Sequence, residues 1–478
     1  IVFIKFFLFR YSDILLLGEK AMMNIKDLYL RQEELMNKEI EVSGWVKSNR
    51  NQKHFGFIEL RDGTCFKTCQ LIYEDDLKDF ETISNIKLGS AIIAKGIMVK
   101  SPKEQQPFEI KLKEVVLEGD CPNDYPLQPK DHSREFLREI AYLRPRANLF
   151  QAVFRIRNTA SFAIHKFFQE KGFIYVNTPL ITANDGEGAG EMFRVTTLDI
   201  ENEKVKIDYS QDFFGKKVGL TVTGQLEGET FAMAFKNIYT FGPTFRAENS
   251  NTKLHAAEFW MVEPEMAFCD LNSLMDLEEE MLKYVIKYVL ENCKDEMDFC
   301  NKYVEKGLID KLTSVLNSTA IRVSYEEAMN KLIEVKDKFT EAPAYGMDIG
   351  SEYEKYLTNE LYKAPVFITD WPKEMKAFYM KQNPDNKTVA AVDLVVPGAG
   401  ELMGGSERET DYDKLVARMN ELNIKTEPLE WYINLRKYGG ATHSGFGMGF
   451  ERLIIYLTGV ENIRDVIAYP RTAGNCEY

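Results

Sequence analysis

The chain has 478 residues, 45% of them hydrophobic and 28% charged, a composition that indicates a folded globular protein too long for one compact domain. Its net charge of −14 excludes the overall basic field with which proteins bind nucleic acid without sequence preference. The seven cysteines, among which Cys65 and Cys69 have no second pair at zinc spacing, predict reduced thiols in the cytoplasm rather than disulfides or a metal cage.

An apolar but interrupted segment begins the chain. Charged side chains divide IVFIKFFLFRYSDILLL into runs too short to span a bilayer, and no small-residue cleavage site follows. We therefore expect residues 1–23 to be a non-native or disordered leader, with Met22 or Met23 as the natural start. A targeting peptide is the alternative, and no membrane partner is expected.

Residues 24–118 show the element order of a small β-barrel. EIEVSGWV (39–46) and HFGFIELRDGT (54–64) alternate apolar and polar residues, as half-buried strands do, and FKTCQLIYE predicts a third strand. Helical spacing over 75–86 follows, and SAIIAKGIMVK and FEIKLKEVVLEG predict two more strands. Three strands, a helix and two strands is the order of an OB-fold, which often binds oligonucleotides, although the pattern alone does not decide this.

A hinge and a larger domain follow. Residues 119–144 begin with GDCPNDYPLQPKDH, which has three prolines and little periodicity and is typical of a hinge. Residues 145–478 open with a long amphipathic helix that ends at Gly172, and they are rich in helical spacing near 271–306. Strand patterns before and after this helical insertion predict an α+β domain.

FRAENSNTKLHAAEF (245–259) predicts two strand ends around a polar loop. The planar guanidinium of Arg246 is suited to bidentate binding of a phosphate or a carboxylate, and Phe259 offers a flat apolar face. The plain alternative is a charged hairpin whose ion pairs are exposed.

Two later stretches add groups that suit a polyphosphate. GFGMGFERL (445–453) predicts a glycine-rich turn that feeds a helix and carries Arg452, although many tight turns look alike. VDLVVPGAGELMGGSERE (392–409) places Asp393 and Glu401 at the two ends of a strand–turn segment, and such hard oxygen ligands suit Mg²⁺ shared with phosphates. Solvated carboxylates on a hairpin are the alternative.

Together these stretches resemble the signature motifs of the class II aminoacyl-tRNA synthetases. YVNTPLI (175–181), which contains Pro179, is similar to motif 1, FRAE…HAAEF to motif 2 and GFGMGFERL to motif 3. An N-terminal OB-fold before a hinge resembles subclass b, and TVTGQLEGETFAMAF resembles its asparaginyl branch, from about residue 24 to the end of the chain. The resemblance implies an OB-fold β-barrel that binds the anticodon, followed by a catalytic domain with an antiparallel sheet flanked by helices.

The resemblance also implies an activity. Members of the family activate an amino acid, here asparagine, with ATP and Mg²⁺, and they transfer it to the terminal adenosine of the cognate tRNA, at the 3′-hydroxyl. No protein nucleophile is needed, because positioning and charge stabilisation suffice for attack of the substrate carboxylate on the α-phosphate. Motif 1 forms the dimer interface in the family, so a homodimer through the region of Pro179 is expected.

By motif position, the resemblance assigns ATP contacts to Arg246, Glu248, Phe259, Glu401, His443, Gly449 and Arg452. Arg246 would bind the α-phosphate and the substrate carboxylate, and Arg452 would lie over the adenine near the γ-phosphate, so these two are the expected catalytic residues. Glu248 would hold the adenine amino group, and Phe259 would stack under the ring.

Two further assignments concern the metal and a histidine. Asp393 and Glu401 would hold Mg²⁺ across the phosphates. His443, in ATHSGFG, matches a nucleotide-binding position, and a hydrogen-bonded structural histidine is the alternative.

Four residues are implied for the amino acid: Glu187, Gln225, Glu229 and Arg408. Glu187 looks like the residue that takes the α-ammonium group. Aspartyl relatives carry a lysine where this chain has Gly228, so the cation that binds the aspartate side chain is missing here.

A neutral carboxamide needs one donor for its oxygen and one acceptor for its NH₂. Arg408, which matches the family's arginine, can donate. Glu229 is the candidate acceptor and Glu227 the weaker one, while a role of Glu229 in ordering its loop alone is the alternative. An aspartate would place an anion beside this carboxylate, so the stretch GQLEGE (224–229) predicts a preference for asparagine.

In the barrel, Phe57 and Gln70 match the family residues that stack on and hydrogen-bond the central uridine of the anticodon. Without the resemblance, Phe57 would be predicted in the core. This site cannot separate asparagine from aspartate tRNAs, whose anticodons share their first two bases.

Other functions remain open at this point. An aspartyl enzyme of relaxed tRNA choice is one, and the absent lysine at Gly228 argues against it. A catalytically silent, synthetase-like RNA-binding protein is another, and the joint presence of Arg246, Arg452, Asp393 and Glu401 argues against it. A free-standing asparagine synthetase of this fold would leave the barrel without a role.

Overall fold

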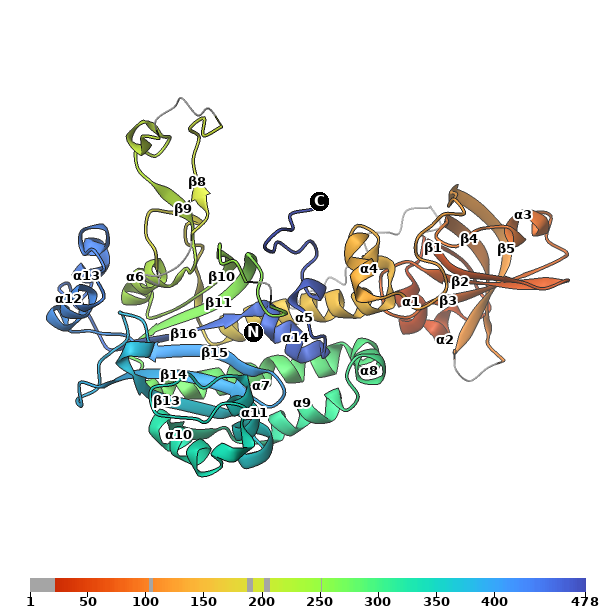
Figure 1. The fold of residues 1–478 in the computed structure, drawn as a ribbon. Helices are drawn as coiled ribbons and strands as arrows, with labels where there is room; N and C mark the ends of the chain where they lie inside the picture. The colour runs from red at the N-terminus through yellow and green to blue at the C-terminus, as the bar shows by residue number, and fades with distance from the viewer. Residues whose placement is uncertain (1–21, 103–105, 187–191, 202–206, 251) are drawn as a thin grey trace, which may run out of the picture. The chain divides into compact units, whose positions relative to one another are not determined.

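The computed structural model describes residues 22–102, 106–186, 192–201, 207–250 and 252–478. The chain forms two compact units, one through Leu137 and one from Arg138 onward (Figure 1). Nearly all of the expected leader, and Glu187, lie outside the described residues. None of the helices in the described ranges is long and apolar enough to cross a membrane.

The first unit is a closed five-stranded barrel with the strand order β1-β2-β3-β5-β4. Along β4 every second side chain is buried, as in Ile92, Ala94 and Met98, because successive side chains of a strand point to opposite faces. The predicted order of three strands, a helix and two strands is confirmed, so the unit is an OB-fold. Its elements are α1 (Ile25–Leu30), α2 (Gln32–Leu35), β1 (Glu39–Asn51), β2 (Phe55–Arg61), β3 (Cys69–Glu74), α3 (Phe80–Ser84), β4 (Ala91–Lys100) and β5 (Phe108–Gly119).

The second unit is built on an eight-stranded sheet with the order β12-β13-β14-β15-β16-β11-β10-β6 (Figure 1). A separate small sheet has the order β7-β9-β8. The strands are β6 (Ile174–Tyr175), β7 (Ile181–Thr182), β8 (Arg194–Val195), β9 (Val218–Leu220), β10 (Asn237–Phe245), β11 (Glu258–Ala267), β12 (Ile321–Ser324), β13 (Val366–Pro372), β14 (Thr388–Val396), β15 (Gly400–Glu407) and β16 (His443–Gly449).

The large sheet is mixed, and most of its strand pairs are antiparallel. Its six central strands, from β13 to β10, pair antiparallel. The edge strands β6 and β12 pair parallel with β10 and β13. Each parallel pair is joined by a long connection that contains a helix, as parallel pairing requires.

Helices cover the sheet, and α7 packs against β14, β15 and β16 while α5 packs against α7 and α8 (Figure 1). The predicted long helix is confirmed as α5, and Gly172 follows it with a positive φ of 76°. The helices are α4 (Arg134–Glu139), α5 (Asn148–Glu170), α6 (Gln225–Phe235), α7 (Leu271–Asn292), α8 (Lys294–Tyr303), α9 (Leu308–Asn317), α10 (Tyr325–Glu334), α11 (Ser351–Lys355), α12 (Tyr412–Glu421), α13 (Glu430–Asn434) and α14 (Phe450–Thr458). Shorter turns are η1 (Arg144–Arg146), η2 (Tyr209–Gln211), η3 (Lys336–Lys338), η4 (Tyr356–Leu361), η5 (Lys373–Met375), η6 (Glu427–Leu429) and η7 (Ile463–Asp465).

The glycine-rich stretch GFGMG is strand β16 rather than the predicted turn. It lies between β15 and β11 in the middle of the sheet. A Cβ at Gly445 would collide with the carboxylate of Glu265, and one at Gly447 would lie 2.9 Å from Cε of Met261. The glycines therefore leave room for side chains of the neighbouring strand β11, and α14 follows directly.

GQLEGE does not form the predicted loop, because Gln225 opens helix α6. Its residues through Phe235 pack against β10 and β11, with Leu226, Glu229 and Ala232 buried. Tertiary packing of this face outweighs the weak helix propensity of Gly228. The carboxylates of the stretch therefore project from a helix whose first turn reaches the edge of the site.

Candidate active site

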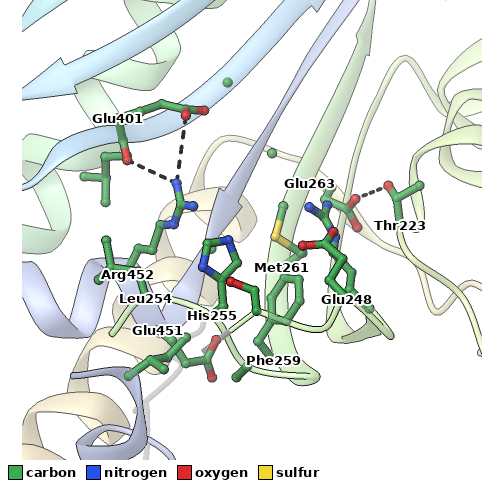
Figure 2. A pocket seen from close by; sticks show the side chains of 18 of the residues that line it. Thr223, Glu248, Leu254, His255, Phe259, Met261, Glu263, Glu401, Glu451 and Arg452 are labelled. Carbon is green, nitrogen blue, oxygen red and sulfur yellow. Dashed lines mark hydrogen bonds and ion pairs between the residues drawn. The ribbon is translucent and has the colours of Figure 1, made fainter. Parts of the chain in front are cut away.

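A cavity of about 320 Å³ lies on the face of the sheet opposite α7. Two consecutive glycines of β15 show which groups lie on each face of the sheet. A side chain at Gly404 would meet Glu401 and Asp393, whereas one at Gly405 would meet Glu278 of α7. The walls of the cavity come from β11, β15 and β16, from the loop between β10 and β11, and from the starts of α6 and α14 (Figure 2). Segments far apart in sequence therefore meet in one chamber.

The loop between β10 and β11 supplies an arginine and an aromatic ring. The guanidinium of Arg246 lies 5.5 Å from the ring centroid of Phe259, and the backbone N–H of Arg246 donates to the carbonyl of Ala257 at 3.0 Å. Glu248 lines the same wall and is exposed (Figure 2). A flat apolar ring beside a cation suits a purine base and its phosphates.

Arg452 and Glu401 both line the cavity and lie next to each other (Figure 2). Nη1 of Arg452 lies 3.9 Å from Oε2 of Glu401 and 3.5 Å from its carbonyl oxygen, and the two side chains are 39% and 46% exposed. The preceding Glu451 is buried and fixes the start of α14, since it accepts from Arg157 at 2.7 Å and from the N–H of Trp260 at 2.9 Å. Arg452 is thus a solvated cation at a helix start that the contacts of Glu451 hold in place.

Glu401, which lines the cavity, has the buried Asp393 beside it. Both carboxylates approach Gly404, where a Cβ would lie 3.1 and 3.3 Å from their oxygens. Asp393 accepts from Nζ of Lys376 at 2.6 Å. Burial raises the pKa of Asp393 to about 6 and the charges of Glu401 and Asp348 add to the rise, while Lys376 opposes it. Such repulsion between carboxylates is relieved by a cation.

Gln225 is held at the cavity edge by a buried glutamate. Glu263 of β11 accepts from the backbone N–H of Gly224 and from the hydroxyl of Thr240, each at 3.0 Å, and also from the hydroxyl of Thr223 (Figure 2). A carboxylate at the first turn of α6 also matches the positive end of the helix dipole. Glu263 therefore fixes the helix start that presents Gln225.

Arg408 lines the cavity from the end of β15, and its charge is already paired. Its Nε donates to Glu265 at 3.2 Å, its Nη2 donates to the same carboxylate, and its Nη1 donates to Ser406 at 2.8 Å. Burial and the charge of Glu229 raise the pKa of Glu265, and the two Arg408 donors oppose this rise. The pair forms a buried, oriented set of donors.

Glu229 lies behind Gln225, and four polar side chains contact its carboxylate. Oε1 accepts from Gln225 at 3.1 Å and from the hydroxyl of Tyr432 at 2.9 Å; Oε2 accepts from Arg436 and contacts Nε2 of His443, each at 3.0 Å. Burial raises the pKa of Glu229, but Arg436 and then His443 lower it by more, so this pKa lies below its ordinary range.

The structure brings together most of the residues predicted for the site. The cavity wall contains Arg246, Glu248, Phe259, Glu401, Gly449, Arg452, Gln225 and Arg408. Within the described residues, the wall does not include Asp393, Glu229 or His443. The buried ring of His443 contacts the carbonyl of Ala441 and Glu229, the arrangement of a hydrogen-bonded structural histidine.

A second cavity, of about 310 Å³, contains Glu227 and Pro179 in its wall. Glu227, the weaker candidate for the carboxamide, therefore faces away from Arg408. Burial raises the pKa of this carboxyl above its ordinary value.

Four residues of the site were not predicted from the sequence: Glu263, Glu265, Tyr432 and Arg436. The spacing of Glu263 and Glu265 is a usable signal, because two carboxylates two apart in an apolar strand share one face. Tyr432 and Arg436 are four apart, as on one side of a helix, but the sequence does not say what they face.

In the barrel, Phe57 and Gln70 lie on adjacent strands. Phe57 is paired with Ile72 and Glu59 with Gln70, so the two side chains are diagonal neighbours on one face. Phe57 is half-buried on the outer face rather than in the core, and Nε2 of Gln70 donates to Glu109 at 2.9 Å. Phe57 also meets Phe55 edge-on at 5.5 Å.

Residues 133–473 match the family model of the class II tRNA synthetases (D, K and N), and residues 40–118 match that of the OB-fold nucleic acid binding domain. The chain is 54% identical to an asparagine–tRNA ligase of Desulfitobacterium hafniense and 56% identical to one of Acholeplasma laidlawii. Each alignment covers 95% of this chain and 99% of the relative.

Solved structures give the same result. An asparaginyl-tRNA synthetase of Pyrococcus horikoshii, complexed with asparaginyl-adenylate, matches with a TM-score of 0.83 at 28% identity, over 96% of this chain and 100% of that one. One from Entamoeba histolytica, also in complex with asparaginyl-adenylate, matches with a TM-score of 0.81 at 26% identity, again over 96% and 100%.

Proposed function

Since the chain belongs to the asparagine–tRNA ligases, within the class II tRNA synthetases, we propose that it ligates asparagine to its cognate tRNA in two steps. ATP and asparagine first form asparaginyl-adenylate and pyrophosphate. The asparaginyl group then moves to the 3′-hydroxyl of the terminal adenosine of the tRNA, and AMP leaves.

The observation that carries this proposal is the single cavity that joins two sets of groups. One set, which contains Arg246, Phe259 and Arg452, suits a nucleotide, and the other, Gln225 and Arg408, suits a small polar amino acid. The two reactants of the first step are therefore held in one chamber, as an in-line reaction requires.

In the activation step, a carboxylate oxygen of asparagine attacks the α-phosphorus and pyrophosphate departs. In this proposal Arg246 holds both the α-phosphate and the attacking carboxylate, and Phe259 stacks under the adenine. Arg452, solvated and fixed through Glu451, is placed to meet the departing phosphates. The contribution of these cations is stabilisation of charge on the phosphate oxygens, without a covalent intermediate on the protein.

Mg²⁺ fits the acidic side of the cavity. Within the described residues, no group of three or more His, Cys, Asp or Glu side chains could hold a metal on its own. Mg²⁺ is commonly held by one or two carboxylates together with substrate phosphates. Glu401 and Asp393 would hold the ion, which supplies neutralisation of phosphate charge when bound.

Charge balance supports asparagine as the amino acid. Arg408 is paired with Glu265, and Arg436 with Glu229, so the buried set is neutral as a whole. An aspartate side chain would add an uncompensated anion to this desolvated set, whereas a carboxamide adds none.

Glu229 stays our candidate for the carboxamide NH₂, although it lies behind the cavity wall. Gln225 lines the cavity and is a donor to Oε1 of Glu229. Movement of Gln225 would open this oxygen to the substrate, with Arg408 as donor to the carboxamide oxygen. A purely structural role of Glu229 remains the alternative that the variants below distinguish.

The barrel is proposed to bind the anticodon, with Phe57 stacked on the central uridine and Gln70 hydrogen-bonded to it. Phe57→Ala should raise the KM for tRNA in aminoacylation by about 5- to 150-fold, since stacking contributes about 1–3 kcal/mol per base. ATP–pyrophosphate exchange should not change. An unchanged KM for tRNA would place the anticodon elsewhere.

A homodimer and a cytoplasmic location complete the proposal. Ile174, Tyr175, Leu180 and Ile181, around motif 1, are 37–42% exposed, which is apolar surface suited to a subunit interface. All seven cysteines lie in the described part of the chain and none is in a disulfide, which agrees with a reducing compartment.

The deciding experiment is ATP–pyrophosphate exchange without tRNA, with asparagine compared with aspartate over a range of concentrations. Exchange that strongly favours asparagine is expected. Exchange that favours aspartate would overturn the amino acid but not the chemistry. Absence of exchange with both would favour the silent RNA-binding protein.

A further inference from the structure

Arg436, which follows α13, reaches Glu229 with a fully oriented guanidinium. Its Nη2 donates to Oε2 of Glu229 at 3.0 Å and to the hydroxyl of Tyr432 at 2.9 Å. Its Nε donates to the carbonyl of Glu409 at 2.9 Å, and its Nη1 to that of Tyr432 at 3.1 Å. The side chains of Arg436 and Glu229 are 1% and 0% exposed, so no solvent replaces this contact.

The donors divide the carboxylate of Glu229 into two sides. Oε2 receives Arg436 and His443, which belong to the core behind the cavity. Oε1 receives Tyr432 from the same core and Gln225 from the cavity wall. Gln225 is therefore the one of these four donors that lines the cavity, and Oε1 is the oxygen that movement of Gln225 would open to a substrate.

We propose that Arg436 is a specificity-determining positioning residue: it keeps Glu229 anionic with Oε1 toward the cavity, and so maintains the preference for asparagine over aspartate. This inference rests on the proposed function of Glu229 as the acceptor for the carboxamide. Arg436 itself does not touch the substrate, and its role is exerted through Glu229.

The chemical reason is that protonation inverts what Glu229 offers. The anion accepts a hydrogen bond from a carboxamide N–H and repels a carboxylate. The protonated acid has an O–H that donates to a carboxylate, so it would accommodate aspartate. A buried carboxyl without a cationic partner is protonated well above its ordinary pKa, because burial disfavours the charge.

Several other polar and ionisable groups face Glu229 and must be considered when a pH dependence of the asparagine-to-aspartate ratio is interpreted. They are Glu265 on β11, Arg408 directly after β15, His443 on β16, Tyr432 on α13 and Gln225 on α6 itself. All of them are present in the unaltered enzyme as well. A pH dependence that appears only when Arg436 is replaced is therefore assigned to the loss of Arg436.

The test compares Arg436→Met, which removes the cation, with Arg436→Lys, which keeps a charge but loses the fork. Lys437→Met is the matched control, since it removes the neighbouring cation, which is exposed and lies 4.2 Å from the ring centroid of Tyr412. The measurement is ATP–pyrophosphate exchange with asparagine and with aspartate between about pH 6 and pH 8.5, a range above the ordinary carboxyl pKa values.

For Arg436→Met, the asparagine-to-aspartate ratio of kcat/KM should fall about 10- to 100-fold at the acidic end, the loss expected for one charged hydrogen bond, and recover partly as the pH rises. The KM for asparagine should rise while the KM for ATP stays. Arg436→Lys should restore most of the ratio. In the unaltered enzyme and in Lys437→Met the ratio should change with pH by much less than it does in Arg436→Met.

A second pair of variants covers the case in which Arg436→Met does not fold. Glu229→Gln alone and Glu229→Gln with Arg436→Met should both have a low ratio at every pH, and the double variant removes both buried charges together. If Arg436→Met and Arg436→Lys keep the full ratio while Glu229→Gln loses it, the proposal for Arg436 is wrong and that for Glu229 stands. If Glu229→Gln keeps the ratio, both are wrong, although the enzyme class is unaffected.

Discussion

The two halves of the cavity handle charge in opposite ways. In the nucleotide half, Arg452 and Glu401 are 39% and 46% exposed and their charged atoms are 3.9 Å apart. In the amino-acid half, Arg408 and Glu265 are 3% and 1% exposed and form a bidentate pair. One half keeps its charges in water until the ligand arrives, and the other keeps them paired in the protein interior.

The difference follows from what we propose that each half recognises: ATP in the half with Arg452 and Glu401, and asparagine in the half with Arg408 and Glu265. ATP brings several negative charges of its own, so solvated cations that exchange water for phosphate are sufficient. An asparagine side chain brings no charge, and it differs from aspartate only in an NH₂ group in place of an oxygen. Discrimination on that scale needs donors and acceptors that are fixed and dry, because a mispaired group then cannot turn to water.

The largest expected effect separates function from stability in the nucleotide half. Arg452→Ala, and equally Arg246→Ala, should lower ATP–pyrophosphate exchange by at least about 100- to 1000-fold, the usual cost of losing one stabilising group at a phosphate. The free energy of unfolding should change by less than about 1 kcal/mol for Arg452→Ala, because an exposed ion pair contributes little.

A matched control for this change is Lys253→Ala. Lys253 belongs to the loop between β10 and β11, is 67% exposed and pairs with Glu461 at 2.7 Å. Lys253→Ala should leave both the rate of ATP–pyrophosphate exchange and the free energy of unfolding unchanged. Retained exchange in Arg452→Ala would show that the nucleotide binds differently from our assignment.

The next effect is the converse, a loss of stability in the amino-acid half. Arg408→Met leaves Glu265 buried without its cation, which should lower the free energy of unfolding by about 3–5 kcal/mol. Urea unfolding measures this loss, and Glu265→Gln in the same chain should recover part of it. Equal stability of Arg408→Met and Arg452→Ala would remove the contrast between the halves.

The nucleotide half was largely predictable from the sequence. Arg246 and Phe259 lie at the ends of one hairpin, so their proximity follows from local strand pairing, and the motif resemblance added Arg452. The same reasoning failed at Gly445, where the glycine pattern of a turn is also the pattern of a strand that leaves space for neighbouring side chains.

The amino-acid half was only partly predictable, because its partners are remote in sequence and their burial decides their roles. Glu229 is held by Arg436, and Glu265 by Arg408, across more than a hundred residues in each case. The sequence named Glu229 and Arg408, but it did not contain the information that Glu229 stands behind Gln225. Arg436 contacts another residue, Glu229, and does not line the cavity, so no sequence motif identifies it.

Replacement of Glu278 has the smallest expected effect on stability. It tests how a buried carboxyl without a hydrogen-bond partner differs from the arginine-paired Glu229 and Glu265. Glu278 lies on α7, behind the sheet, at 0% exposure, and neither carboxyl oxygen has a hydrogen-bond partner among the described residues. Burial, and then the charge of Asp393, raise the pKa of Glu278 well above 4.5. Glu278→Met should therefore stabilise the protein at pH 8, by about 1–3 kcal/mol, the cost of an unsatisfied buried polar group.

The sign of the pH dependence is the critical part of this prediction. Below about pH 4.5 the acid is protonated in the folded and unfolded chains alike, so the variant gains least there. As the pH rises, the unfolded chain releases the proton and the folded chain retains it, which favours unfolding of the unaltered protein but not of Glu278→Met. Urea unfolding at several pH values should show the gain growing with pH, whereas Glu280→Met, at an exposed position of α7 paired with Lys171, should show almost none. If the gain in the free energy of unfolding is the same at every pH, the variant acts through packing. Glu278 would then not differ from the paired acids Glu229 and Glu265 in the way that its burial indicates.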